Sequence, residues 1–104
     1  MPKYTFFNSA RKDKRFAVMN PDGKVINFGS PTATTFLDGA TEKKKDAYIA
    51  RHSKNNEDWD YSGRDTPGFW ARHALWSANN IKDVKKYLKK RFGIELVVDS
   101  ETKF

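Results

Sequence analysis

Residues 14–28, KRFAVMNPDGKVINF, decide the fold class because two short apolar runs flank a strong turn signal. Phe16 and Val18 would share one face of a first strand, and Ile26 and Phe28 would share one face of a second. The central NPDG tetrapeptide places Pro at the first central turn position and Gly where a positive φ is tolerated. The stretch therefore predicts a β-hairpin with one apolar face.

Three helices and a further strand are predicted after the hairpin. Each predicted helix begins at a polar N-cap residue. In addition, Pro67 marks the start of the second helix and Gly93 marks the end of the third. The helical segments are residues 41–53 with Thr41 as N-cap, 66–76 with Thr66, and 80–92 with Asn80. Residues 94–98, IELVV, predict a strand. The predicted fold class is α+β: a small antiparallel sheet, made of the N-terminal β-hairpin and the C-terminal strand, packed on two to three helices.

The length of 104 residues suits one domain. The apolar pattern places this single globular α+β domain at residues 14–98. Residues 1–13 are basic and are interpreted as an N-terminal arm that is loose, adds a strand or anchors to a neighbour. Residues 99–104 are interpreted as a frayed C-terminal tail.

The composition favours a folded domain with an anionic partner. Aromatic residues make up 14% of the chain and supply large side chains for a core. No cysteine is present, which excludes disulfides and thiolate metal sites. We expect no membrane span and no secretory signal, because no apolar run is long enough for either. The net charge of +7 indicates nucleic acid, an acidic protein surface or a lipid headgroup layer as the partner.

The most basic segment is the predicted helix 81–92, whose apolar stripe would face the core while six cations cover the rest. These candidate residues for binding an anionic partner are Lys82, Lys85, Lys86, Lys89, Lys90 and Arg91. Such a face binds phosphates by releasing counterions, and its lysines favour general electrostatic binding over base recognition. The alternatives are an ordinary solvated helix face, since lysine is a good helix former, and a membrane-surface helix.

No catalytic or metal site is predicted. His52 and His73 flank a run of carboxylates, and such a set can bind a metal, but no metal-ligand spacing occurs. No nucleophile elbow, dinucleotide-binding loop or phosphate-binding loop is present. We therefore expect a non-enzymatic protein without a cofactor, in which both histidines are structural or exposed.

Four segments form a specific pattern: FAVMNPDGKVINFG (16–29), YIARH (48–52), EDW (57–59) and TPGFWARHALW (66–76). On this pattern, residues 14–92 resemble an uncharacterised family of small basic proteins of the nucleocytoplasmic large DNA viruses, the giant viruses of algae and amoebae. Large aromatics dominate the pattern, so its residues are interpreted as fold-building. They are Tyr48, Arg51, His52, Trp59, Phe69, Trp70, Arg72 and Trp76.

The resemblance implies a virion protein that is present in the host cytoplasm or nucleus during assembly. The expected function is that of a minor capsid or cement component, which contacts capsid proteins or other virion proteins. Phe6, Phe7 and Phe104 are the candidate anchors for these protein interactions. The alternative is a genome-associated protein that binds DNA or RNA, independently of sequence, through the basic C-terminal helix.

Overall fold

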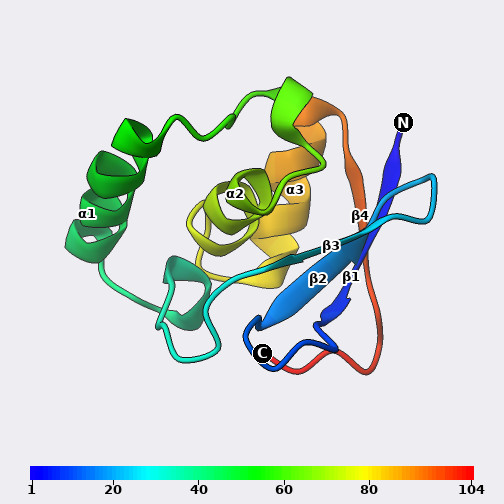
Figure 1. Ribbon diagram of the computed structural model, residues 1–104, viewed down its shortest axis with the longest axis horizontal. Coiled ribbons are helices and arrows are strands. Elements are labelled where there is room, and N and C mark those ends of the chain that lie inside the picture. The colour runs from blue at the N-terminus through cyan, green and yellow to red at the C-terminus, as the bar shows by residue number, and fades with distance from the viewer.

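The computed structural model describes residues 1–104 and contains a four-stranded sheet packed against helices (Figure 1). The strands lie in the order β3-β2-β1-β4. Their bounds are Lys3–Asn8 for β1, Phe16–Met19 for β2, Val25–Phe28 for β3 and Glu95–Val98 for β4. β2 is antiparallel to both β1 and β3, whereas β4 is parallel to β1. The predicted α+β class is confirmed, with a sheet that is mixed but mostly antiparallel.

The predicted hairpin is formed by β2 and β3. Its two apolar pairs are buried: Phe16 with Phe28, and Val18 with Ile26. The backbone N–H of Asn20 donates to the Lys24 carbonyl at 2.8 Å, and the Asn20 side-chain oxygen accepts from the Lys24 N–H at 2.8 Å. Gly23 has a φ of 86°, as the turn requires.

For residues 3–8 of the predicted N-terminal arm, the alternative of an added strand is the one that the structure shows, and the predicted start of the domain at residue 14 is wrong, because these residues form β1 inside the sheet. Tyr4 and Phe6 alternate onto the core face, with exposed fractions of 1% and 0%. A partner strand on each side satisfies the backbone polar groups of β1, which explains why this segment does not remain loose. β1 also separates the hairpin from β4, so the C-terminal strand pairs with β1 alone.

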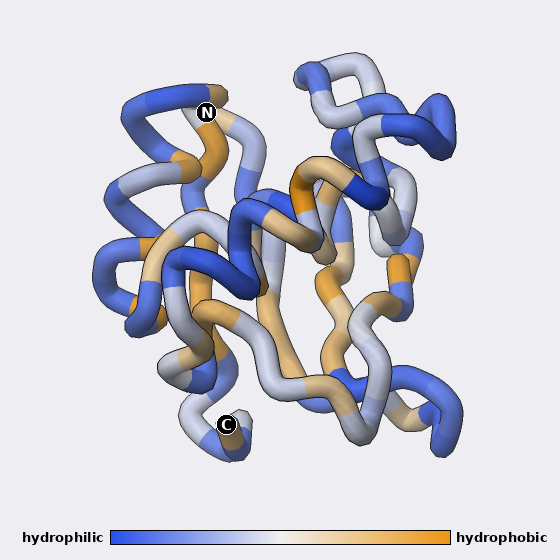
Figure 2. Tube along the Cα trace, turned by 90° about the vertical axis from the view of Figure 1, so that its left-hand side faces the viewer, coloured by the Kyte–Doolittle hydropathy of each residue, from blue (hydrophilic) through white to orange (hydrophobic).

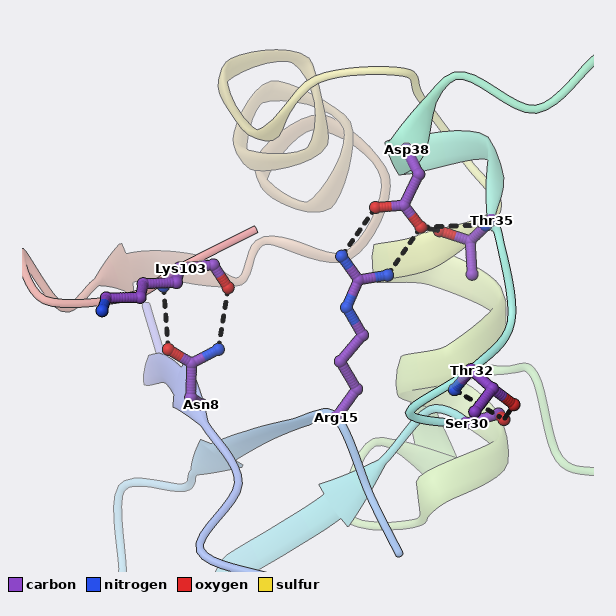
Figure 3. A network of polar contacts seen from close by, with 7 residues as sticks. All are labelled: Asn8, Arg15, Ser30, Thr32, Thr35, Asp38 and Lys103. Atoms are coloured by element: carbon purple, nitrogen blue, oxygen red, sulfur yellow. Dashed lines mark hydrogen bonds and ion pairs between the residues drawn. The ribbon is translucent and has the colours of Figure 1, made fainter. Parts of the chain in front are cut away.

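The predicted frayed tail, residues 99–104, is also wrong, because the tail is tied to β1. The Asp99 N–H donates to the Phe6 carbonyl at 2.9 Å. Asn8 and Lys103 exchange two hydrogen bonds of 2.8 Å, which Figure 3 shows as dashed lines. The Phe104 ring centre lies 5.8 Å from that of Phe6. These contacts hold the tail against the sheet.

The three predicted helices are present. They are α1 (Glu42–His52), α2 (Pro67–Trp70) and α3 (Ile81–Phe92). The side chains of Thr41, Thr66 and Asn80 each accept a backbone N–H of the first turn, as predicted. Gly93 ends α3 with a φ of 66°. α2 continues as a π-helix over Ala71–Leu75, which differs from the regular helix expected there. None of the helices combines the length and apolar character that crossing a bilayer requires.

Arg15 joins the hairpin to the segment that leads into α1. Its guanidinium donates two hydrogen bonds to the Asp38 carboxylate, at 2.6 and 2.7 Å (Figure 3). The same carboxylate accepts from the backbone N–H and the hydroxyl of Thr35, each at 2.9 Å. The bonds from Arg15 lower the pKa of Asp38 to about 2. This bidentate pair fixes the path of the chain from the sheet to α1.

The core between sheet and helices is a cluster of 17 residues rich in aromatic rings. The Trp70 ring centre lies 4.9 Å from that of Tyr4 and 6.3 Å from that of Phe28. The Trp70 indole N–H donates to the Arg64 carbonyl at 2.6 Å, so the buried ring leaves no polar group unpaired. Figure 2 shows hydrophobic residues concentrated on the strands and hydrophilic ones on the outer turns.

Candidate functional site

The six predicted cations of α3 all lie at the surface. Val84 and Leu88 are fully buried beneath the helix, so the cations occupy its solvent side. The three ion pairs of the structure involve other residues. The carboxylate of Asp83, the acidic residue of α3, accepts a hydrogen bond from its N-cap, Asn80, at 2.9 Å. No carboxylate of the protein therefore forms an ion pair with this basic face.

Three of the cations border a groove between α3 and β4, with a volume of about 520 Å³. Lys85, Lys86 and Lys89 lie on one wall, and residues 94–98 lie on the other. The helix and the strand are neighbours because the connection between them is short, as Figure 1 shows. Within this connection the Ile94 N–H donates to the α3 carbonyl of Leu88 at 3.3 Å. The remaining three cations of α3 lie outside the groove.

Several of the predicted fold-building residues gather around Tyr48, between α1 and α2. The Tyr48 ring stacks on His52 at 4.2 Å and on Trp76 at 4.6 Å. Arg72 donates to the Trp76 carbonyl at 2.9 Å, and its guanidinium carbon lies 5.7 Å from the Trp59 ring centre. Burial raises the pKa of the Tyr48 hydroxyl to about 12, and the charge of a nearby carboxylate adds to this shift. These contacts join α1 to the rest of the fold, and Phe69 and Trp70 lie in the core.

A second cavity, of about 450 Å³, opens beside this cluster and is lined in part by Arg51, His52 and Glu57. His52 Nδ1 lies 3.5 Å from Glu57 Oε2, but neither atom has a hydrogen-bond partner although both are buried. Gly68 lies against this carboxyl group, and a Cβ added there would be 3.3 Å from its carbon. Lysine, arginine and carboxylate side chains all line the cavity, so it offers no single charge to a ligand. In the sequence, Glu57 is the first residue of the EDW segment, but no pattern there assigns it a role of its own.

His73 is a buried cross-link between three segments. Its Nε2 lies 2.7 Å from the Trp59 carbonyl oxygen and so carries the proton, and its Nδ1 accepts from the Tyr87 hydroxyl at 2.8 Å. Burial lowers the pKa of His73 to about 4. Its ring also lies 4.6 Å from Phe69 and 4.7 Å from Phe92. Across the whole chain, no three His, Asp or Glu side chains group together in a way that could hold a metal ion.

The predicted protein-interaction anchors are placed differently from one another. The prediction for Phe6 is wrong, because the alternation of β1 turns this side chain into the core, where it is 0% exposed. Phe104 is 53% exposed, and its ring rests 5.8 Å from both Phe6 and Phe16. Phe7 is half-buried. Phe7 and Phe104 remain candidate anchors.

The fold and these surfaces define a small α+β protein with a basic face on α3. A family model described as a family of unknown function, DUF5754, matches residues 4–52. The matched residues run from β1 to the end of α1, so the similarity concerns the sheet and the first helix rather than the basic face. No curated protein and no solved structure matches the chain.

Proposed function

We propose that this protein is a non-enzymatic binding protein that attaches to an anionic macromolecule through the basic face of α3. The supporting observation is that six exposed cations on one short helix have no carboxylate paired with them. In the setting implied by the resemblance, the protein is a minor capsid or cement component of a large DNA virus. Its partner there is an acidic surface of a neighbouring virion protein.

A second candidate is sequence-independent binding of nucleic acid, and the charge density of α3 favours it. From Lys82 to Arg91 the helix rises about 14 Å. A stretch of B-DNA of that length carries about eight phosphate charges. The six cations are thus comparable in number to the phosphate charges on both strands of a DNA segment of the same length. Five of the six are lysines, which act as point charges and suit backbone contacts better than base recognition.

The test measures binding of the purified protein to two labelled polyanions, a short DNA duplex and poly-glutamate, each across a salt series. The variant Lys85→Glu/Lys86→Glu/Lys89→Glu removes the centre of the basic face. The control Lys43→Glu/Lys44→Glu/Lys54→Glu changes the net charge equally at exposed positions on α1 and just after it. We expect the first variant to lose at least about tenfold in affinity and the control to lose about threefold or less.

The two polyanions separate the candidates. Tight duplex binding with a log–log salt slope of roughly −0.9 per phosphate contacted establishes the nucleic-acid role. Retention on poly-glutamate but not on the duplex favours attachment to an acidic protein. An equal loss in both triple variants, or no binding of either polymer at low salt, would overturn the proposal.

A further inference from the structure

The buried polar side-chain atoms that lack a hydrogen-bond partner in this protein all lie around one aromatic ring, Tyr48. They are His52 Nδ1, Glu57 Oε2 and Trp59 Nε1. The ring centres of His52 and Trp59 lie 4.2 and 6.4 Å from that of Tyr48. Glu57 Oε2 lies 3.5 Å from His52 Nδ1. Buried polar atoms are otherwise almost always paired, so a group of unpaired ones marks a place where the fold has not been optimised for stability alone.

The outer atoms of His52 and Glu57 are open to a ligand. His52 Nε2 and Glu57 Oε1 form no hydrogen bond within the protein, and solvent reaches both of them. A proton on Nδ1 avoids placing two lone pairs against each other, and it leaves a lone pair on Nε2 of the neutral ring. An ionised carboxylate oxygen likewise only accepts. The pair therefore presents two hydrogen-bond acceptors, and Gly68 leaves space beside one of them, since a Cβ there would be 3.3 Å from Oε1.

The cavity that these atoms border, of about 450 Å³, also carries two cations without an ion-pair partner. Lys14, just before β2, and Arg51, on α1, both line the cavity and take part in none of the ion pairs of the protein. Asp13 lines it as well, but its carboxylate is paired with Arg11 at 2.7 Å. A ligand in this cavity thus meets two positive charges and two hydrogen-bond acceptors.

We propose that the cavity binds a guanine nucleotide, with the base edge against the His52–Glu57 pair and the phosphate against the two cations. The Watson–Crick edge of guanine has two adjacent donors, N1–H and the 2-amino group. Adenine and cytosine place one amino donor beside a ring acceptor, and uracil places one donor between two acceptors, so guanine alone matches two acceptors. A phosphate dianion balances both cations and accepts hydrogen bonds from them.

Other small ligands fit the cavity less well. A metal ion would need a third His, Asp or Glu side chain, and no such group of three exists in the protein. A free amino acid brings one negative charge against two cations. The cavity volume falls in the range of sites for larger organic ligands, and Leu75 and Trp76 on its wall offer apolar contact to a flat base. No residue of α3 lines this cavity, so the inference stands apart from the proposed function.

Isothermal titration calorimetry with GMP, AMP and guanosine tests the base edge and the phosphate separately. We expect GMP to bind at least about tenfold more tightly than AMP, whose base offers one donor fewer to the acceptor pair. We also expect GMP to bind at least about tenfold more tightly than guanosine, which lacks the phosphate. The trinucleotides UGU and UAU distinguish a free nucleotide from one within a single strand. Binding of UGU but of neither GMP nor UAU would assign the site to a strand, and binding of GMP alone would assign it to the free nucleotide.

Variants of the cavity assign each half of the ligand to its residues. Glu57→Gln keeps the side-chain shape and should reduce the preference for GMP over AMP to about threefold or less. Arg51→Gln should weaken GMP at least about tenfold but leave guanosine within about twofold. The control Lys54→Gln removes the same charge just after α1, outside the cavity, and should change GMP binding by about threefold or less. Circular dichroism checks that each variant is folded.

The measurements on the unmodified protein decide the inference even where a variant does not fold. Equal affinity for GMP and AMP would mean that only phosphate is recognised, and it would overturn the assignment of guanine. Tighter binding of free arginine than of GMP, or no binding of any nucleotide at millimolar concentration, would overturn it as well. A preference for GMP that persists in folded Glu57→Gln would place the base elsewhere. None of these results bears on the basic face of α3.

Discussion

His73 and His52 both lie against aromatic rings, but their ring nitrogens have different neighbours. His73 is 2% exposed, and its two nitrogens are hydrogen-bonded to a carbonyl and a hydroxyl. The His52 side chain is 29% exposed, and its Nδ1 has no hydrogen bond although the Glu57 carboxylate is 3.5 Å away. The first ring joins separate segments of the fold, whereas the second borders a cavity.

The difference shows that a nearby charge is a poorer guide to stabilisation than complete hydrogen bonding. A buried polar group contributes when each of its atoms has an aligned partner, and removing such a partner leaves another group unpaired. A partly exposed pair without alignment gains little, because water screens the attraction. The region around His73 should therefore be sensitive to mutation, and the region around His52 should tolerate it.

The largest expected effect is that of His73→Ala. The substitution removes a buried ring and leaves the Trp59 carbonyl and the Tyr87 hydroxyl unpaired, so we expect a loss of about 4 kcal/mol in unfolding free energy. Urea denaturation followed by circular dichroism measures it. Tyr87→Phe is the matched milder change, which removes one hydrogen bond and should cost about 1 kcal/mol. Equal losses for the two variants would contradict the role of His73 as a cross-link.

Acid should destabilise the protein through the same histidine. Burial, aided by the charges of Arg72 and Arg91, lowers the folded-state pKa of His73 to about 4, compared with 6.5 for the free side chain. Between these values the unfolded chain binds a proton that the folded protein does not. The stabilisation is therefore complete above about pH 6.5 and decreases towards pH 4, by about 1.4 kcal/mol per unit and about 3 kcal/mol in total.

The matched variant for this pH dependence is His73→Gln, which cannot titrate. Its unfolding free energy should lack the slope between pH 6.5 and 4 that the wild-type protein shows. The Asp38 carboxylate, whose pKa is lowered from 3.8 to about 2 by Arg15, contributes only at more acidic pH. The same slope in both proteins would show that folded His73 accepts the proton without penalty.

The smallest expected effect is that of Glu57→Gln, which keeps the shape of the side chain and removes its charge. Because Glu57 Oε2 has no hydrogen bond, we expect a change below about 0.5 kcal/mol in unfolding free energy. The same urea titrations measure it. A loss above about 2 kcal/mol would show that His52 and Glu57 form a tight buried pair, and the contrast between the two histidines would disappear.

Elements that depend on a few adjacent residues could be predicted from the sequence. The caps at Thr41, Thr66 and Asn80 and the turn that begins at Asn20 involve partners within four positions. β1 was predicted only as one of three alternatives for the basic N-terminal segment, although Tyr4 and Phe6 alternate as in a half-buried strand. The alternation of apolar residues with a period of two was the informative signal for β1. The basic composition of the segment kept the loose arm and the anchor as alternatives.

The candidate site was predictable only in part. The exposure of the α3 cations follows from helical periodicity, since Val84 and Leu88 define the buried side. The position of β4 beside those cations depends on how β4 pairs with β1, and no local pattern specifies that pairing. The partners of His73 come from the loop before α2 and from α3, so its environment exists only after the segments have packed.

The pairing of β1 with β4 also sets an order of events during synthesis. β1 leaves the ribosome early and can pair with β2 as soon as the hairpin has been made, but its other side waits for residues 95–98. Until then the nascent chain carries an unpaired strand in what will become the interior of the sheet. Such a strand is a template for aggregation or for chaperones. Translation that stops before β4 would therefore release an aggregation-prone chain. Once β4 is made, it pairs with β1, and the edge of β1 is no longer available to other chains.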